Sequence, residues 1–371
     1  MMRVAIVVDS LKVGGAQRLV SAFASRASNH GIQPLIITLN KSKSTVVSET
    51  INQAGVRVII LSAPSLLNAK RLRQLIRTFQ TEKIDIVQTH LMYSNILGTI
   101  AARIAGIPVI ATLHSVDVTS GWKPQLLKRL HDYFLKNLAT RILAVGNVVA
   151  EAQAGSFGGR KLDVIPNGIP EPEPIRAHAR DKLRKEIAGD EDSPIIITVG
   201  RFTRAKGYED MIKAFSLIRD RTTKPVLLMV GDGSMTDSIK QRIESLELSE
   251  SVILTGERSD VPQLLASSDV YASASHREGL PLALLEAMMA GLPVVATSVG
   301  DIPNVVTEET GVIVPPHQPN ELAAALEGLL QNPERREAMG RAAQQRALNE
   351  YSVDAWIKRH AALYKEVLST K

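Results

Sequence analysis

Apolar strand-like runs alternate with amphipathic helical patterns along the whole chain, and the alternation restarts after a polar interruption. Seven such runs lie in residues 1–170, beginning with Arg3–Val8, and six more begin with Ile195–Val199. Strands that alternate with helices form parallel sheets covered by helices. The stretch Ile169–Ser193 is rich in Pro, Glu, Arg and Asp, which is typical of a linker followed by a short charged helix. The pattern predicts an α/β fold with two doubly wound, Rossmann-like domains in tandem.

The domain boundaries follow from this interruption. We assign residues 1–170 to the first domain and residues 171–352 to the second. At 371 residues the chain is longer than one ordinary core, so two domains are also expected from its length. A last helix is expected over residues 353–371, with Ser352 as its N-cap. We predict that this helix packs back on the first domain. Ligands bind outside the carboxyl ends of parallel strands, so we expect the two domains to face each other across a ligand-binding cleft.

Charge is divided unevenly between the two halves. Residues 1–170 contain 20 Lys and Arg against 8 Asp and Glu, whereas the remaining residues contain 24 against 30. A basic half can face nucleic acid, an anionic membrane or phosphorylated substrates. Aromatic residues make up 4% of the chain and do not interleave with basic ones, so we expect no nucleic-acid partner.

Several kinds of site are excluded by missing motifs. The chain has no cysteine, which removes disulfides, thiolate metal sites and thiol nucleophiles. A His-Glu-x-x-His motif and an Asp cluster are absent as well, so no metal site is predicted. The missing Gly-x-Gly-x-x-Gly, P-loop and Gly-x-Ser-x-Gly motifs argue against dehydrogenases, kinases and serine hydrolases. No apolar run approaches the roughly 18–20 residues of a membrane span, and we expect a cytoplasmic protein.

The densest set of candidate ligand-binding groups follows the predicted strand Val270–Ala272. Glu278, Gly279 and Leu280 precede a helix expected over Pro281–Ala290, and Glu286 lies about a turn and a half inside it. Pro281 suits the first turn of that helix. A helix N-terminus carries unpaired N–H groups and a partial positive charge. Two carboxylates and an exposed backbone are therefore expected to surround a polar, anionic ligand here.

A basic loop leaves the first predicted strand of the second domain. Gly200 follows that strand, Arg201 comes next, and Lys206 precedes Gly207. Two cations at the carboxyl end of a parallel strand can clamp a diphosphate. The alternative is a solvated basic loop in which Gly207 ends a turn. The glycines at this place favour the phosphate site.

The first domain offers weaker signals. Gly14 and Gly15 follow the first strand and open a helix, which suits either a phosphate site or a plain tight turn. His114 follows an apolar strand and is expected at the cleft edge, with His90 placed similarly after another strand. A lone histidine is more often structural than catalytic, so these residues alone leave its role open.

Two basic helical segments, residues 69–80 and 125–138, suit a membrane surface. Lys70, Arg71, Arg73 and Arg77 are expected on the basic face of the first segment. In the second segment, Leu126 and Leu130 belong to an apolar stripe at helical spacing, which is expected to face the core. The basic faces can contact anionic lipid headgroups, with a binding free energy of about 1 kcal/mol per cation. Peripheral contact with the inner face of a membrane is therefore consistent with the sequence.

Taken together, these motifs resemble the retaining GT-B glycosyltransferases called group 1 or family 4. Glu278 and Glu286 match the Glu-x7-Glu motif of that family, and Gly200–Gly207 matches its Gly-Arg-x4-Lys-Gly element. Further matches follow in order along nearly the whole chain: Pro166-Asn167-Gly168, Gly231-Asp232-Gly233, Gly256 before Asp260-Val261, and Ala290-Gly291-Leu292-Pro293-Val294-Val295. One departure is Gln17, where relatives commonly carry Glu.

The resemblance implies a role for each residue. Arg201 and Lys206 would hold a nucleotide diphosphate, Glu286 would accept hydrogen bonds from ribose hydroxyls, and Glu278 would contact the transferred sugar. His114 would line the sugar pocket near the reacting carbon. The implied donor-binding set also includes Gly14, Gly15, Asn167, Gly200, Gly256, Arg258, Gly279, Leu280 and Pro281.

The resemblance also implies a reaction. The enzyme would move a hexosyl-type sugar from a nucleotide-sugar, expected to be a UDP-sugar, to a glycan or lipid-linked acceptor in cell-envelope polysaccharide biosynthesis. Retention would follow from front-face displacement without a metal or other cofactor. The alternatives are a glycan phosphorylase or a nucleotide-sugar epimerase of the same fold, and a non-catalytic sugar-nucleotide-binding protein.

Overall fold

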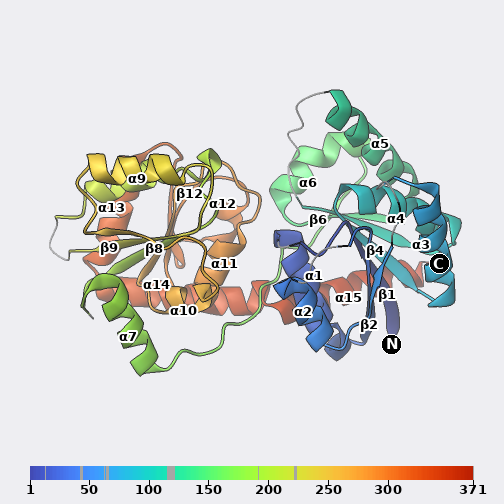
Figure 1. The fold of residues 1–371 in the computed structure, drawn as a ribbon, viewed down its shortest axis with the longest axis horizontal. Helices are drawn as coiled ribbons and strands as arrows, with labels where there is room; N and C mark the ends of the chain where they lie inside the picture. The colour runs from blue at the N-terminus through green and yellow to red at the C-terminus, as the bar shows by residue number, and fades with distance from the viewer. Residues whose placement is uncertain are drawn as a thin grey trace. The chain divides into compact units, whose positions relative to one another are not determined.

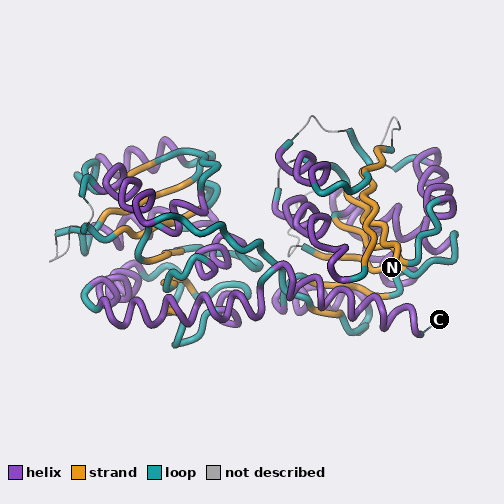
Figure 2. The backbone as a smooth tube through the Cα atoms, turned by 90° about the horizontal axis from the view of Figure 1, so that it is seen from below, coloured by secondary structure: helices purple, strands orange, loops and turns teal. Residues whose placement is uncertain are grey.

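The computed structural model describes residues 1–12, 14–41, 45–61, 63, 67–114, 122–190, 192–220 and 224–370, with residues 122–124 as backbone only. The chain divides into two compact units (Figure 1). One unit contains Met1–Pro170 together with Ser352–Lys371, and the other contains Glu171–Tyr351. In each unit the strands lie between helices, as the tube in Figure 2 shows.

The first unit is built on a seven-stranded parallel sheet in the order β3-β2-β1-β4-β5-β6-β7. The strand order reverses between β1 and β4, where open α/β sheets bind their ligands. Val8 at the end of β1 pairs with His90 at the end of β4, which in turn pairs with Thr112 of β5. The strands are β1 (Met2–Val8), β2 (Ile32–Thr38), β3 (Val58–Ile60), β4 (Ile86–His90), β5 (Val109–Leu113), β6 (Arg141–Ala144) and β7 (Asp163–Val164).

Helices that follow the strands bury their apolar faces against this sheet. Leu75 and Phe79 of α3 pack with Val7 and Val87 of the strands, and Leu135 of α5 packs with Ala111. The helices are α1 (Gly15–Arg26), α2 (Val46–Gln53), α3 (Ala69–Thr81), α4 (Met92–Ile104), α5 (Trp122–Leu138), α6 (Asn147–Gln153) and α15 (Val353–Ser369), with 3-10 turns η1 (Ala27–His30) and η2 (Ala154–Phe157).

Helix α15 packs on the first unit although it follows the second unit in sequence. Ser352 caps its N-terminus by accepting a hydrogen bond from the Ala355 N–H at 3.3 Å. Trp356 meets Phe23 of α1 edge-on, with ring centroids 5.7 Å apart. The buried hydroxyl of Tyr364 donates to Gln88 of β4. Apolar burial and a buried hydrogen bond therefore hold this helix on the sheet.

The second unit repeats the plan with a six-stranded parallel sheet in the order β10-β9-β8-β11-β12-β13. Here the order reverses between β8 and β11. The strands are β8 (Ile195–Val199), β9 (Val226–Val230), β10 (Val252–Leu254), β11 (Val270–Ser273), β12 (Val294–Thr297) and β13 (Gly311–Val314). The fold class predicted from the alternating pattern, two parallel α/β sheets, is confirmed.

The helices of the second unit enclose one large core in which Ile196, Phe215 and Leu326 are completely buried. The helices and turns are α7 (Ala177–Ala188), η3 (Arg204–Lys206), α8 (Tyr208–Ser216), α9 (Thr236–Ser245), α10 (Val261–Ala266), α11 (Leu282–Met289), α12 (Ile302–Val305), α13 (Pro319–Leu330), α14 (Pro333–Arg346) and the π turn η4 (Ala347–Tyr351). Among the described residues, no helix combines the length and the apolar character that crossing a bilayer requires.

Three local expectations are wrong. Pro281 is the N-cap of α11 rather than a residue of its first turn, and its backbone is extended. Arg71 does not lie on a basic face of α3, because it is buried and donates to the Leu61 and Ala63 carbonyls. Leu126 and Leu130 of α5 are exposed, whereas Leu135 of this helix is completely buried.

Candidate functional site

Lys206 and Glu278 form an ion pair at the carboxyl edge of the second sheet. The Lys206 Nζ donates to the Glu278 Oε1 at 2.5 Å. Lys206 ends the turn η3 after β8, and Glu278 lies between β11 and α11. Because β8 and β11 are neighbours in the sheet, their loops meet although the two residues are 72 positions apart. The side chains are 27% and 11% exposed, so the pair is partly enclosed but reachable.

The loop that follows β11 orients the Glu278 carboxylate. Ser275 donates its hydroxyl to the same Oε1 at 2.7 Å, and the Ser275 carbonyl accepts from the Thr297 hydroxyl at 2.5 Å. Burial raises the pKa of Tyr208 and of Tyr271, and the negative charge of Glu278 raises both pKa values further. The charge of Glu286 contributes to the raised pKa of Tyr271 as well. Both carboxylates therefore act on one buried tyrosine and belong to one electrostatic site.

Two glycines allow the loops around this pair to approach closely. Gly207 has a φ of +62°, and a Cβ added to it would lie 1.9 Å from the Ala274 carbonyl oxygen. Gly300 has a φ of +58°, and its added Cβ would lie 2.4 Å from the Glu278 carbonyl oxygen. The Asp301 N–H also donates to the Gly279 carbonyl at 2.9 Å. The backbone of Glu278 and Gly279 is thereby fixed by a neighbouring loop.

Arg201 is exposed, and within the described ranges its guanidinium forms no ion pair or side-chain hydrogen bond. Gly200, which precedes Arg201, leaves room for Tyr208 and Lys206. A Cβ on Gly200 would lie 3.1 Å from the Tyr208 hydroxyl and 3.7 Å from the Lys206 Cε. Glu286 is half-buried within α11. Two cations, Arg201 and Lys206, and two carboxylates, Glu278 and Glu286, thus lie around the carboxyl ends of β8 and β11.

The remaining predicted residues of the second unit lie around this group. Leu280 is 9% exposed, and Pro281 caps α11. The Gly256 carbonyl accepts from the Gly231 N–H at 2.9 Å, which joins the ends of β9 and β10. Arg258 forms a two-point ion pair with Asp260 at 2.7 and 2.6 Å. Its charge is therefore already engaged, unlike that of Arg201.

In the first unit, the structure brings His114 and His90 together. The His90 Nδ1 and the His114 Nε2 lie 2.9 Å apart, so one ring donates to the other. Burial lowers the pKa of His114 to about 4 and that of His90 well below its ordinary value. Both imidazoles are therefore neutral at physiological pH. Because His90 ends β4, His114 follows β5, and these two strands are adjacent, sheet order explains a contact that their separation in sequence does not reveal.

Gly14, Gly15 and Asn167 also lie in the first unit. Gly14 caps α1 and Gly15 is its first residue. A Cβ on Gly14 would lie 2.5 Å from the Gln17 Oε1, so the side chain of Gln17 folds over this turn. Asn167 is 6% exposed, and its Oδ1 has no hydrogen-bond partner among the described residues. The expectation that these residues share one cleft with those of the second unit stays a prediction.

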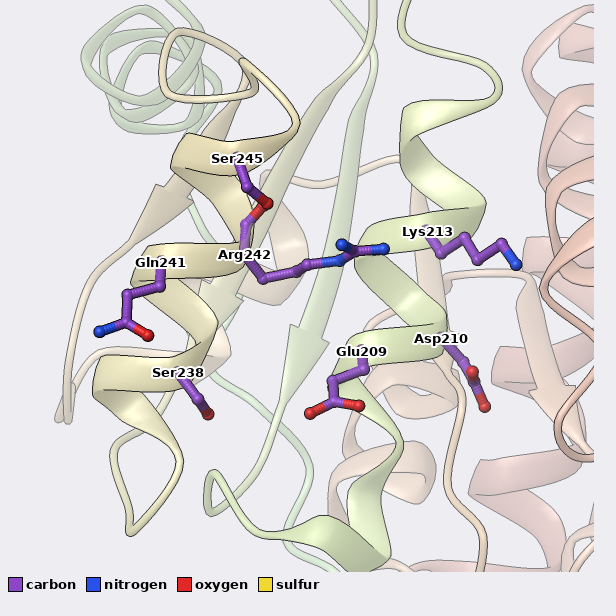
Figure 3. Close-up of a pocket in the computed structure, with 7 residues that line it drawn as sticks. All are labelled: Glu209, Asp210, Lys213, Ser238, Gln241, Arg242 and Ser245. Atoms are coloured by element: carbon purple, nitrogen blue, oxygen red, sulfur yellow. The ribbon is translucent and has the colours of Figure 1, made fainter.

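Sequence reasoning missed two features of the second unit. A groove of about 530 Å³ lies between α8 and α9, where Arg242 reaches toward α8 (Figure 3). It contains none of the predicted donor-binding residues, and it lies on the helical face rather than at the strand ends. The other feature is a cluster of three possible metal ligands, Asp210, His276 and His317. The members come from three separate loops and helices, so no local spacing could have revealed them.

Comparisons with known proteins support the family and the fold. Residues 13–171 match the family described as Glycosyltransferase Family 4, and residues 179–346 match the one described as Glycosyl transferases group 1. A UDP-Gal:alpha-D-GlcNAc-diphosphoundecaprenol alpha-1,3-galactosyltransferase of Escherichia coli is 32% identical over 62% of this chain and 62% of its own length. The N-acetyl-alpha-D-glucosaminyl L-malate synthase of Bacillus anthracis is 26% identical over 78% of this chain and 76% of its own length.

The fold is shared with a solved structure over its full length. Anabaena Alr3699/HepE in complex with UDP has a TM-score of 0.86 and 23% identity, with 100% of both chains covered. This likeness confirms the fold predicted from the motifs, and the two matched family models confirm the family. Since the two matched families together account for most of the chain, it belongs to the group 1 glycosyltransferases of family 4 and has the GT-B fold.

Proposed function

We propose that this enzyme transfers a hexosyl-type sugar from a UDP-sugar to a glycan or lipid-linked acceptor, with retention at the anomeric carbon. The observation that carries the proposal is the Lys206–Glu278 ion pair beside the uncommitted Arg201. Two cations at strand ends suit a diphosphate, and two carboxylates suit the hydroxyls of a sugar and a ribose.

The ion pair suggests how the donor is received. The diphosphate binds Arg201 and draws the Lys206 ammonium toward itself. The Glu278 carboxylate, which Ser275 holds at 2.7 Å, then accepts a hydrogen bond from a hydroxyl of the transferred sugar. Glu286, further along α11, accepts from the ribose. The pair keeps both groups compensated while the site is empty, because an unpaired, partly buried charge is costly.

Transfer then requires charge stabilisation rather than a side-chain base. The bond between the anomeric carbon and the phosphate oxygen breaks, and Lys206 and Arg201 stabilise the charge that grows on the leaving diphosphate. The acceptor hydroxyl attacks the oxocarbenium-like sugar from the face that the diphosphate leaves. Its proton passes to the departing phosphate oxygen, so the two carboxylates are not an acid–base pair of the hydrolase type.

We infer that the first unit binds the acceptor. The low pKa of His114 keeps its imidazole neutral, so it can exchange hydrogen bonds with sugar hydroxyls without adding a positive charge near the oxocarbenium. The N–H groups at Gly14 and Gly15 open α1 and would bind phosphate or sugar oxygens. The order of events is that the second unit binds the nucleotide and the first unit presents the acceptor.

The donor and acceptor classes are taken from the relatives. The E. coli relative is named for a UDP-galactose donor and a diphosphoundecaprenol acceptor, and Alr3699/HepE was solved with UDP. We therefore propose a UDP-sugar and a lipid-linked acceptor of cell-envelope polysaccharide synthesis. The B. anthracis relative, named for malate, indicates that acceptors vary within this family.

An exposed apolar and basic side of α5 supports the proposal of a lipid-linked acceptor. Leu126, Leu130 and Tyr133 are 52%, 41% and 62% exposed, and their spacing places them along one side of the helix. Arg129 and Lys136 on the same helix are exposed as well. Exposed leucines with basic neighbours suit the surface of an anionic bilayer. We propose that this side of α5 contacts the membrane in which the acceptor lies.

A panel of nucleotide-sugars tests the proposal directly. We expect one UDP-sugar to raise the melting temperature most and to be turned over by the wild-type enzyme in the presence of a chelator. Lys206→Ala should abolish most turnover, whereas Lys240→Ala, an exposed lysine on α9, should not change it. Phosphate-dependent turnover would indicate a phosphorylase, and an altered donor sugar would indicate an epimerase. Tight UDP binding without turnover of any donor would leave a binding protein.

A further inference from the structure

Three metal-ligating side chains of the second unit converge outside the proposed donor site. Asp210 lies in the first turn of α8, His276 in the loop between β11 and α11, and His317 between β13 and α13. The Asp210 Oδ2 is 2.8 Å from the His276 Nε2 and 3.7 Å from the His317 Nδ1. One ligand atom from each of the three residues lies within 4.8 Å of the other two.

Two imidazoles and a carboxylate are a donor set that suits Zn²⁺. Zinc bonds of about 2.0–2.2 Å in a tetrahedral site place neighbouring ligand atoms roughly 3.3–3.6 Å apart. The two distances from Asp210 lie on either side of that spacing. The His317 side chain is 65% exposed, so its ring can rotate to bring its nitrogen closer to that of His276. Zinc binding therefore requires only small side-chain movements.

Two further observations distinguish the cluster from an ordinary Asp–His hydrogen bond. Both histidines approach the same carboxylate oxygen, and their rings lie 3.8 Å apart and tilted by 36°. His317 also has a φ of +61°, a left-handed conformation that few residues other than glycine adopt. Such a conformation persists where the surroundings hold it, and it is frequent at ligand sites. Asp210 is among the residues that line the α8–α9 groove, but its carboxylate points away from Arg242 (Figure 3).

We propose that Asp210, His276 and His317 bind one Zn²⁺ ion, with a fourth position open to water. The chain has no cysteine, so no thiolate site competes for the metal. The ion would lie behind the donor-binding loops rather than on the reacting atoms. Asp210 follows Lys206 closely, His276 precedes Glu278 closely, and the His276 N–H donates to the Ala205 carbonyl at 2.8 Å. The metal would thus tie the two loops that carry the ion pair to the loop before α13.

Metal titration of the untagged, chelator-treated protein tests this proposal without any activity assay. We expect one equivalent of Zn²⁺ per chain, a rise in melting temperature, and with Co²⁺ the visible absorption of a four-coordinate ion. His317→Ala should weaken Zn²⁺ binding at least about 10-fold, since even loss of an outer-sphere partner costs that much. Asp210→Asn should do the same, and His178→Ala, an exposed histidine of α7, should have no effect.

Because the His317 side chain is 65% exposed, we expect its variant to stay folded, and the melting temperature without metal checks this. Absence of saturable Zn²⁺ binding by the wild-type protein would overturn the proposal. So would equal Zn²⁺ affinity in the wild type and in both His317→Ala and Asp210→Asn. Neither result bears on sugar transfer, because the proposed reaction does not use this ion.

Discussion

Removing the Lys206 ammonium has two separable consequences, one for stability and one for catalysis. Lys206→Ala leaves the Glu278 carboxylate, 11% exposed, without its cation. Breaking a fully buried pair costs about 3–5 kcal/mol, and the residual exposure of both groups reduces this to about 1–3 kcal/mol. Loss of a donor that stabilises transition-state charge lowers kcat by about 10²–10³. Lys206→Ala should therefore be both less stable and nearly inactive.

A double variant separates the two effects. Glu278→Gln replaces the carboxylate by an amide, which needs no counterion, so the pair Lys206→Ala with Glu278→Gln should recover at least about 1 kcal/mol of unfolding free energy. Its turnover should stay low, because the leaving diphosphate still lacks its cation. Urea unfolding measures the first quantity, and initial rates at saturating donor measure the second.

Two results would refute this reasoning. If the unfolding free energies of the two single variants simply add in the double variant, the contact of 2.5 Å contributes no coupling and the pair has no structural role. If Lys206→Ala retains turnover within about twofold of the wild type, the transition-state role is wrong. Lys240→Ala controls for the loss of one positive charge from the same unit.

Three other predictions concern the loops, the histidine pair and α5. Gly207→Ala should destabilise the protein by more than about 1–2 kcal/mol in urea unfolding, since it adds left-handed strain to a contact of 1.9 Å; an unchanged midpoint would contradict the loop packing. Since the pKa of His114 falls from 6.5 unfolded to about 4 folded, stability should decrease as pH falls from 6.5 toward 4, by up to about 2 kcal/mol at pH 5. His114→Gln should lose less stability than the wild type over that interval. Leu130→Glu should weaken binding to anionic vesicles, and added salt should weaken binding of the wild type; binding that responds to neither would remove the membrane surface from α5.

The sequence was sufficient to predict the two sheets and which loops lie at their carboxyl ends, because strand periodicity is local. It was not sufficient to predict which loops touch. Lys206 contacts Glu278 because β8 lies beside β11, and that order is a property of the whole sheet. For the same reason the contact between His90 and His114 was not foreseen. Arg71 has the residue type of a surface position, and its hydrogen bonds to the Leu61 and Ala63 carbonyls, which offset the cost of its burial, link residues that sequence patterns do not relate.

Helix α14 was missed by the sequence-based prediction for a different reason. It was not predicted, because its sequence, Pro333–Arg346, is polar on nearly every side. Its buried contacts are made by Met339, Gly340 and Ala343. A Cβ on Gly340 would lie 2.2 Å from the Gly291 carbonyl oxygen, so this helix packs by close backbone approach. Small residues produce no apolar stripe, and pattern analysis therefore finds no helix.

The position of α15 has a consequence for synthesis of the protein on the ribosome. The first unit lacks this helix until residues 353–369 have been synthesised. Until then Phe23 lacks its contact with Trp356, and Gln88 lacks its hydrogen bond from Tyr364. At about 5–20 residues per second, the roughly 200 residues after Pro170 take on the order of 10–40 s to translate. During that interval the nascent first unit exposes an apolar surface, which suits a chaperone. A chain that stops at Tyr351 would carry that surface permanently.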